Sequence, residues 1–142
     1  MEMAMRLFSV LLTGAALVSC TAIPPPPTRT AQAQQRYDML LAGKIAQAPV
    51  SCLPSYSAND MIRIDDDTIA FRDGSRRVYV NHMHGPCSGL SNDSNALVTV
   101  EHTPPGPCSG DIARVVDTMN QMTVGSCAWG DFVPYAVPGT RA

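Results

Sequence analysis

Residues 68–81 read Thr68-Ile69-Ala70-Phe71-Arg72-Asp73-Gly74-Ser75-Arg76-Arg77-Val78-Tyr79-Val80-Asn81, and this stretch decides the fold. Its two halves alternate in polarity and carry β-branched and aromatic residues, which favours β-strands. Asp73-Gly74 between them is a strong hairpin signal. The stretch therefore predicts two antiparallel strands joined by a tight turn.

Further short strands are expected on both sides of this hairpin. They cover residues 59–64, 96–100, 112–116 and 123–129, with 132–133 as an extension of the last. Turn residues separate these segments and no helices alternate with them, so a parallel sheet is not expected. The sequence predicts a mainly β domain, a small antiparallel sheet curled into a barrel or a sandwich.

One helix is expected before the strands. Residues 31–47 contain no proline and are rich in Ala, Gln and Leu, while Pro49 would stop a helix. Four apolar residues recur there at helical spacing and predict a stripe that packs on the domain: Tyr37, Leu40, Leu41 and Ile45. A helix lying on a membrane surface is the alternative, but the segment has few of the basic residues that such helices usually carry.

Composition places the chain among small globular proteins. Its 142 residues allow one small domain, and 45% are hydrophobic against 15% charged. Ten Lys and Arg residues against twelve Asp and Glu give a formal net charge of −2. This balance excludes the basic surface that nucleic-acid binding requires, so no nucleic-acid partner is expected.

The first nineteen residues are expected to be a signal peptide. Arg6 precedes an apolar run over residues 7–18. As a helix this run would reach roughly 18 Å, which is too short for a hydrocarbon core of about 30 Å. A charged start, a short apolar run and small residues at its end are typical of a secretory signal.

The run ends in Leu17-Val18-Ser19-Cys20, which resembles the lipobox of bacterial lipoproteins. The resemblance implies that the Cys20 thiol receives a diacylglycerol, that the chain is cut before Cys20, and that the new amino group is acylated by a fatty acid such as palmitate. Several acyl chains would make a stable membrane anchor. Thr21 stands where an Asp would favour the inner membrane, so the resemblance implies the periplasmic face of the outer membrane. The alternative is an ordinary signal peptide with a chance cysteine.

Residues 20–30 are expected to form the lipid anchor and a linker. Four consecutive prolines, residues 24–27, favour an extended polyproline conformation and exclude a helix or a central strand. The linker would act as a semi-rigid spacer above the bilayer. Residues 31–138 would then form one β domain with its helix at the N-terminal end.

Four cysteines follow the anchor, and an even number in an exported domain predicts two disulfides. In a meander of strands, Cys87 and Cys108 would lie a strand length apart, too far for a bridge. The same order places Cys52 near Cys108 and Cys127 nearer Cys87, which favours the pairs Cys52–Cys108 and Cys87–Cys127. Long loops beside residues 95–101 leave the pairing of Cys87 with Cys108 open.

Gly-Pro-Cys-Ser-Gly occurs twice, at residues 85–89 and 106–110. A duplicated ligand-binding turn is one interpretation. A tight turn that holds a bridged cysteine is the better one, because five residues are too few to indicate a duplicated fold.

One cluster has metal-ligand potential. Alternation on a strand would place His82 and His84 on one face, and His102 could join them from a neighbouring strand. Imidazole ligands suit copper or zinc, with copper the better candidate beside the chain's methionines. Solvated loop histidines are the simpler interpretation, so no metal or other cofactor is expected beyond the lipid on Cys20.

Catalysis is not indicated by any motif in the chain. The sequence contains no Gly-x-Ser-x-Gly elbow, no His-Glu-x-x-His and no glycine-rich phosphate loop. The triplet Asp65-Asp66-Asp67 lacks the spacing, the glycine and the distal glutamate of a calcium loop, and predicts a solvated turn instead. We therefore expect a protein that is not an enzyme.

The domain resembles a group of uncharacterised small lipoproteins of Gram-negative alphaproteobacteria between about residues 42 and 135. The resemblance rests on five blocks: residues 51–54, 66–69, 78–81, 108–112 and, most distinctively, Gly130-Asp131-Phe132-Val133-Pro134-Tyr135. It implies an envelope protein and no particular activity. The expected function is a non-catalytic lipoprotein that binds an unknown envelope partner or supports the cell surface, and the alternative is a periplasmic lipoprotein that binds copper or zinc.

Overall fold

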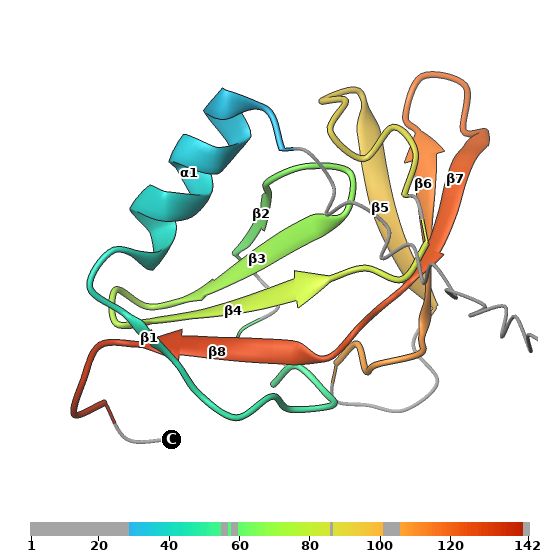
Figure 1. The fold of residues 1–142 in the computed structure, drawn as a ribbon. Helices are drawn as coiled ribbons and strands as arrows, with labels where there is room; N and C mark the ends of the chain where they lie inside the picture. The colour runs from blue at the N-terminus through green and yellow to red at the C-terminus, as the bar shows by residue number, and fades with distance from the viewer. Residues whose placement is uncertain (1–28, 55–56, 58–59, 86, 101–105, 141–142) are drawn as a thin grey trace, which may run out of the picture.

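The computed structural model of the chain describes residues 29–54, 57, 60–85, 87–100 and 106–140 (Figure 1). The predicted signal peptide, Cys20, the linker up to residue 28 and His102 lie outside these residues. The described part is mainly β and antiparallel, as the sequence predicts. Its elements are α1 (Ala31–Leu41), β1 (Ile45–Ala46), β2 (Met61–Arg63), β3 (Thr68–Asp73), β4 (Arg77–His82), β5 (Asn95–Val100), β6 (Ile112–Asp117), β7 (Thr123–Ala128) and β8 (Phe132–Ala136).

The strands form two antiparallel sheets that do not close into a barrel. The first sheet has the order β1-β8-β4-β3-β2, and the second has the order β5-β6-β7. In Figure 1 the helix covers one side of the first sheet, and the second sheet stands at the other end of the molecule. The last strand β8 returns from the second sheet to pair with β4 in the first.

The predicted hairpin is the centre of the first sheet. β3 and β4 pair from Thr68 opposite His82 to Asp73 opposite Arg77, and Gly74 takes a positive φ of 61° in the turn. Alternation along the strands sends successive side chains to opposite faces. Because both faces are covered, residues 68–71 of β3 and 78–81 of β4 are buried.

Two apolar cores lie on the two faces of this sheet. The larger core joins the two sheets, and Trp129 stacks on Phe132 within it with ring centroids 5.6 Å apart. Its buried members are Leu53, Ile69, Phe71, Tyr79, Met83, Cys87, Leu90, Ala113, Val115, Cys127, Trp129 and Phe132. The smaller core lies between α1 and the sheet and contains Ala33, Ile64, Ala70, Val78 and Val80.

The helix is shorter than the predicted range of residues 31–47. It begins after Thr30, whose hydroxyl accepts a hydrogen bond from the Ala33 amide at 3.2 Å, and it ends at Leu41. Gly43 follows with a φ of 70°, which suits a chain leaving a helix. Ile45 therefore does not belong to the helical stripe, and that assignment was wrong: Ile45 pairs with Ala136 of β8. Tyr37, Leu40 and Leu41 pack on the smaller core, as the stripe predicts.

Two disulfides link distant parts of the described chain, Cys52–Cys108 and Cys87–Cys127. These are the two pairs that the strand order favours. Cys87 and Cys127 are buried in the larger core, whereas Cys52 is exposed and Cys108 is half-buried. The first disulfide thus lies at the surface and the second inside the molecule.

The repeated pentapeptide forms the same turn twice. The carbonyl of Cys87 accepts from the Leu90 amide at 2.9 Å, and the carbonyl of Cys108 accepts from the Asp111 amide at 3.0 Å. Gly89 and Gly110 occupy the third position of these turns with φ of 81° and 91°. A type II turn requires glycine or asparagine at that position, so the repeat is explained as a turn that presents a bridged cysteine.

A sharp bend at Gly130 carries the chain from the second sheet into the first. A side chain there would overlap the carbonyl oxygen of His82. The buried Asn81 amide holds the bend, since its Nδ2 donates to the Gly130 carbonyl at 2.7 Å and its Oδ1 accepts from the Gly130 amide at 3.2 Å. An isolated bridge between His84 and Ala128 continues the pairing across the joint.

Candidate functional site

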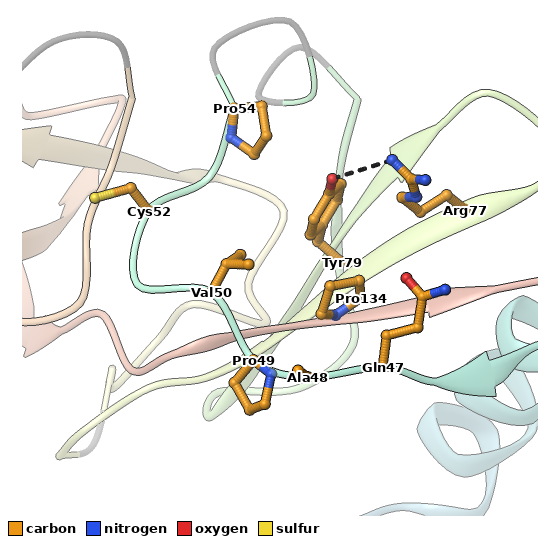
Figure 2. A pocket seen from close by; sticks show the side chains of 9 residues that line it. All are labelled: Gln47, Ala48, Pro49, Val50, Cys52, Pro54, Arg77, Tyr79 and Pro134. Atoms are coloured by element: carbon orange, nitrogen blue, oxygen red, sulfur yellow. Dashed lines mark hydrogen bonds between the residues drawn. The ribbon is translucent and has the colours of Figure 1, made fainter. Parts of the chain in front are cut away.

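A groove of about 590 Å³ opens on the first sheet, between the segment 47–54 and the strands β4 and β8 (Figure 2). This volume lies within the range of about 300–1,000 Å³ that is typical of small-ligand sites. Its lining is mostly apolar and contains three prolines. The lining residues are Gln47, Ala48, Pro49, Val50, Cys52, Pro54, Arg77, Tyr79 and Pro134.

The floor of the groove comes from the first sheet. Tyr79 of β4 lies opposite Pro134 of β8 in the ladder, so both side chains project from the same face. Arg77 stands two residues before Tyr79 on β4 and shares that face. Figure 2 shows the two side chains next to each other, with Pro134 beside the Tyr79 ring.

The opposite wall is the segment 47–54, which is held in place by backbone contacts and a disulfide. The Gln47 amide donates to the Pro134 carbonyl at 2.8 Å, and Val50 exchanges two hydrogen bonds with Phe132 at 2.8 and 2.9 Å. Cys52 is bonded to Cys108. Proline fixes φ and cannot donate, so Pro49 and Pro54 further limit the freedom of this wall.

Arg77 supplies the positive charge of the described lining, and its side chain is only 11% exposed. Arg77 Nη1 lies 3.6 Å from Asp73 Oδ2, which belongs to β3, and 3.5 Å from the Tyr79 hydroxyl. A guanidinium has five N–H donors and binds carboxylates in a two-pronged geometry. The arrangement therefore places an apolar surface next to a guanidinium that is paired with Asp73.

The two described histidines of the predicted metal cluster lie at the joint between the sheets. His82 is at the end of β4, where its Nδ1 is 3.3 Å from the Thr68 hydroxyl, and His84 bridges to Ala128. Partial burial lowers the pKa of His82, and the nearby Arg29 guanidinium lowers it further. In the described part of the chain, no three His, Cys, Asp or Glu side chains are placed to hold a metal ion.

The aspartate triplet forms a turn that is bound to its neighbours. Asp65 accepts from the Asp67 amide at 2.9 Å and from Arg29 Nε at 2.6 Å. Asp66 accepts from the Ser91 amide at 2.6 Å. The short acidic side chains therefore stabilise the turn by accepting hydrogen bonds from nearby backbone amides and from Arg29.

The groove could not be identified from the sequence. Its wall comes from residues 47–54, and its floor comes from β4 and β8, so it exists only after the chain has folded. One signal was available: Arg77 alternates with Tyr79 and Asn81 on a strand whose other face carries Val78 and Val80. A charged residue on a strand that otherwise carries valines and a tyrosine indicates a special environment.

Across the residues that the structure describes, no helix is both long enough and apolar enough to cross a membrane. Neither the models of known protein families, nor the curated proteins, nor the solved structures include a match to this chain.

Proposed function

We propose that this chain is a lipid-anchored, non-catalytic binding module of the cell envelope, built as an open two-sheet sandwich whose groove is the binding site. The lipobox-like Leu17-Val18-Ser19-Cys20 supports the anchor, and it implies the periplasmic face of the outer membrane. The proposal assigns no reaction and no metal to the protein.

The observation that carries the proposal is where the groove lies relative to the tether. Arg29, the first described residue, binds Asp65 and Thr68 at one end of the β3–β4 ladder. Arg77 lines the groove at the other end of that ladder, five residues and roughly 17 Å away. A chain anchored through Cys20 would therefore present the groove away from the attachment point, toward the aqueous side of the envelope.

The predicted linker is long enough to hold the groove away from the membrane. Eight residues, 21–28, separate Cys20 from Arg29, and four of them are prolines. At about 3.1 Å per residue, a polyproline conformation would span roughly 25 Å. This distance would hold the domain clear of the lipid headgroups.

Photo-crosslinking in intact cells tests the proposal. Benzoylphenylalanine at exposed Ala48, on the groove wall, should form a discrete adduct, whereas the same residue at exposed Asn120, in the β6–β7 turn, should not. Filling the groove with Val50→Trp should remove the Ala48 adduct, and Cys20→Ser should reduce it by displacing the protein from the membrane.

Two results would contradict the proposal. One is the absence of any adduct at Ala48 in cells that make the acylated protein. The other is the same set of adducts from Ala48 and Asn120, which would indicate random encounters on the surface.

A further inference from the structure

We infer that a second pocket, between the C-terminal half of α1 and the β3–β4 turn, binds a phosphate group that carries two negative charges. The pocket shares no described lining residue with the groove, so the inference goes beyond the proposed function and does not depend on it. Its volume is about 360 Å³, and its described lining residues are Arg36, Met39, Leu40, Lys44, Arg72, Gly74, Ser75 and Val78.

The fold brings three cationic side chains to this pocket. Arg36 and Leu40 are four residues apart on α1, so they lie on the same side of the helix. Lys44 follows the helix, and its Nζ reaches back to donate to the Leu40 carbonyl at 2.9 Å. Arg72 of β3 lies opposite Val78 of β4, so both side chains project from the sheet face that α1 covers. In Figure 1 the end of α1 and the β3–β4 turn lie at the same end of the first sheet.

Two of the three cations have no carboxylate partner among the described residues. Arg36 Nη1 donates to the Arg63 carbonyl at 2.9 Å, and Lys44 donates to a helix carbonyl. A carbonyl oxygen carries no net charge, so neither contact neutralises the cation. Arg72 is paired with Asp60 at 3.3 Å, but the two side chains are 48% and 51% exposed, and ion pairs as exposed as this one are weak.

The remaining acidic residues of the chain are placed elsewhere. Ten of the twelve Asp and Glu residues are described, and Asp60 is the one among them that is paired with a cation of this pocket. Asp73, which precedes the turn, is paired with Arg77 at the groove. The other two are Glu2, in the predicted signal peptide, and Glu101, which follows β5 of the second sheet. The pocket is therefore a local excess of positive charge in a chain whose net charge is negative.

This excess favours a dianion. A phosphate monoester carries up to two negative charges near neutral pH and has three strong acceptor oxygens, whereas a carboxylate carries one charge. Arginine can bind two phosphate oxygens at once, and lysine binds phosphate as a point charge. The exposed Ser75 hydroxyl can add a donor, and Gly74 beside it has no side chain to block the approach. The apolar side chains Met39, Leu40 and Val78 suit a small organic substituent on the phosphate.

Calorimetry with a matched pair of soluble probes tests this inference. The full-length protein in an uncharged detergent is titrated with phenyl phosphate and with phenyl sulfate, which has the same body and one negative charge. At a pH of about 8 the phosphate monoester carries nearly two charges. We expect phenyl phosphate to bind at least tenfold more tightly than phenyl sulfate.

Four variants locate the binding. Arg36→Met removes one cation and should weaken phenyl phosphate binding about tenfold, whereas Arg114→Met makes the same change at an exposed position on β6 and should leave the affinity unchanged. Ser75→Glu adds a negative charge at an exposed position and should abolish binding. Asp60→Asn removes the partner of Arg72 and should tighten binding about threefold, a gain that misfolding could not produce.

Vesicle flotation identifies the source of the phosphate. The full-length Cys20→Ser variant, which lacks the predicted acylation site, is mixed with phosphatidylcholine vesicles that contain either phosphatidic acid, a phosphate monoester, or phosphatidylglycerol, a diester with one charge. Stronger recruitment by phosphatidic acid at equal vesicle charge, lost in Arg36→Met, would identify a lipid headgroup. Binding of phenyl phosphate without recruitment to vesicles would identify a free organic phosphate.

Equal affinity for phenyl phosphate and phenyl sulfate would overturn the inference, as would phenyl phosphate binding that survives both Arg36→Met and Ser75→Glu. The absence of phenyl phosphate binding at millimolar concentration would also overturn it. If both anionic vesicles then recruited the protein equally, the basic residues would form a general contact with anionic membranes instead. The proposed function would stand or fall separately, through the Ala48 adduct at the groove.

Discussion

Arg29 shows how one side chain can hold the first described residues of the chain against the first sheet. Its Nε donates to Asp65 Oδ2 at 2.6 Å and its Nη2 donates to the Thr68 hydroxyl at 2.8 Å. Its guanidinium also lies 4.2 Å from the centre of the Tyr37 ring. Charge-assisted hydrogen bonds and cation–π contacts are each worth more at partly buried positions than at the surface. Arg29 therefore belongs to the domain, although the sequence places it in the linker.

Replacing Arg29 should destabilise the domain measurably. We expect Arg29→Ala to lower the free energy of unfolding by about 1–2 kcal/mol, because two charge-assisted hydrogen bonds and a ring contact are lost. Urea unfolding monitored by Trp129 fluorescence measures the change. The exposed Arg114→Ala should cost less than about 0.5 kcal/mol, and equal effects of the two substitutions would refute a special role for Arg29.

His82 should make stability depend on pH. Partial burial lowers its folded-state pKa, with a second contribution from Arg29, and the unfolded chain has the ordinary value of 6.5. Below pH 6.5 the unfolded state binds more protons than the folded state, so stability falls as pH falls through that value. His82→Gln should flatten this dependence, and Arg29→Ala should raise the pKa of His82 in an NMR titration. A folded-state pKa above 6.5 would contradict the expected direction.

At the scale of secondary-structure elements, the sequence predicts those strands that a local pattern of alternation and turn residues specifies. The β3–β4 hairpin follows from alternation and Asp73-Gly74, and β5, β6 and β7 follow from short β-branched runs between turns. β1 could not be predicted, because its two residues are strand only through pairing with β8. The predicted end of the helix was wrong for the same reason. Ile45 lies in a segment whose composition favours a helix, but it pairs with β8 as a strand residue.

The bend between β7 and β8 depends on glycine at position 130. A Cβ at Gly130 would overlap the His82 carbonyl, and His82 is fixed by its pairing with Thr68 in the β3–β4 ladder, so we expect Gly130→Ala to cost about 3 kcal/mol. Gly43→Ala meets no neighbouring atom and should cost only about 1 kcal/mol for its positive φ. Chemical denaturation of the two variants provides the comparison. A Gly130→Ala variant no less stable than Gly43→Ala would show that the joint can adjust.

The two disulfides should differ in accessibility to reductant. Cys87 and Cys127 are 0% and 5% exposed, whereas Cys52 is exposed beside the groove. Under mild native reduction we therefore expect Cys52 and Cys108 to be alkylated first, because thiol exchange requires access to a sulfur atom. Peptide mapping after timed alkylation measures the order, and simultaneous labelling of all four cysteines would contradict it.

At the scale of the whole molecule, the predicted anchor and the groove differ in how far sequence can reveal them. The anchor depends on four adjacent residues that end at Cys20, so a local motif is sufficient to predict it. The groove combines residues 47–54 with Arg77, Tyr79 and Pro134, which come together only through the order β1-β8-β4. Long-range strand pairing of this kind leaves no local signal in the sequence except the charged Arg77 on a largely apolar strand.

The measurement that tests the tethered-module proposal most directly is top-down mass spectrometry of the native protein released from envelopes. We predict a chain that begins at Cys20, carries a diacylglyceryl group and an amide-linked fatty acid, and retains the disulfides Cys52–Cys108 and Cys87–Cys127. A product that still carries residues 1–19 without lipid, or one with four free thiols, would contradict it.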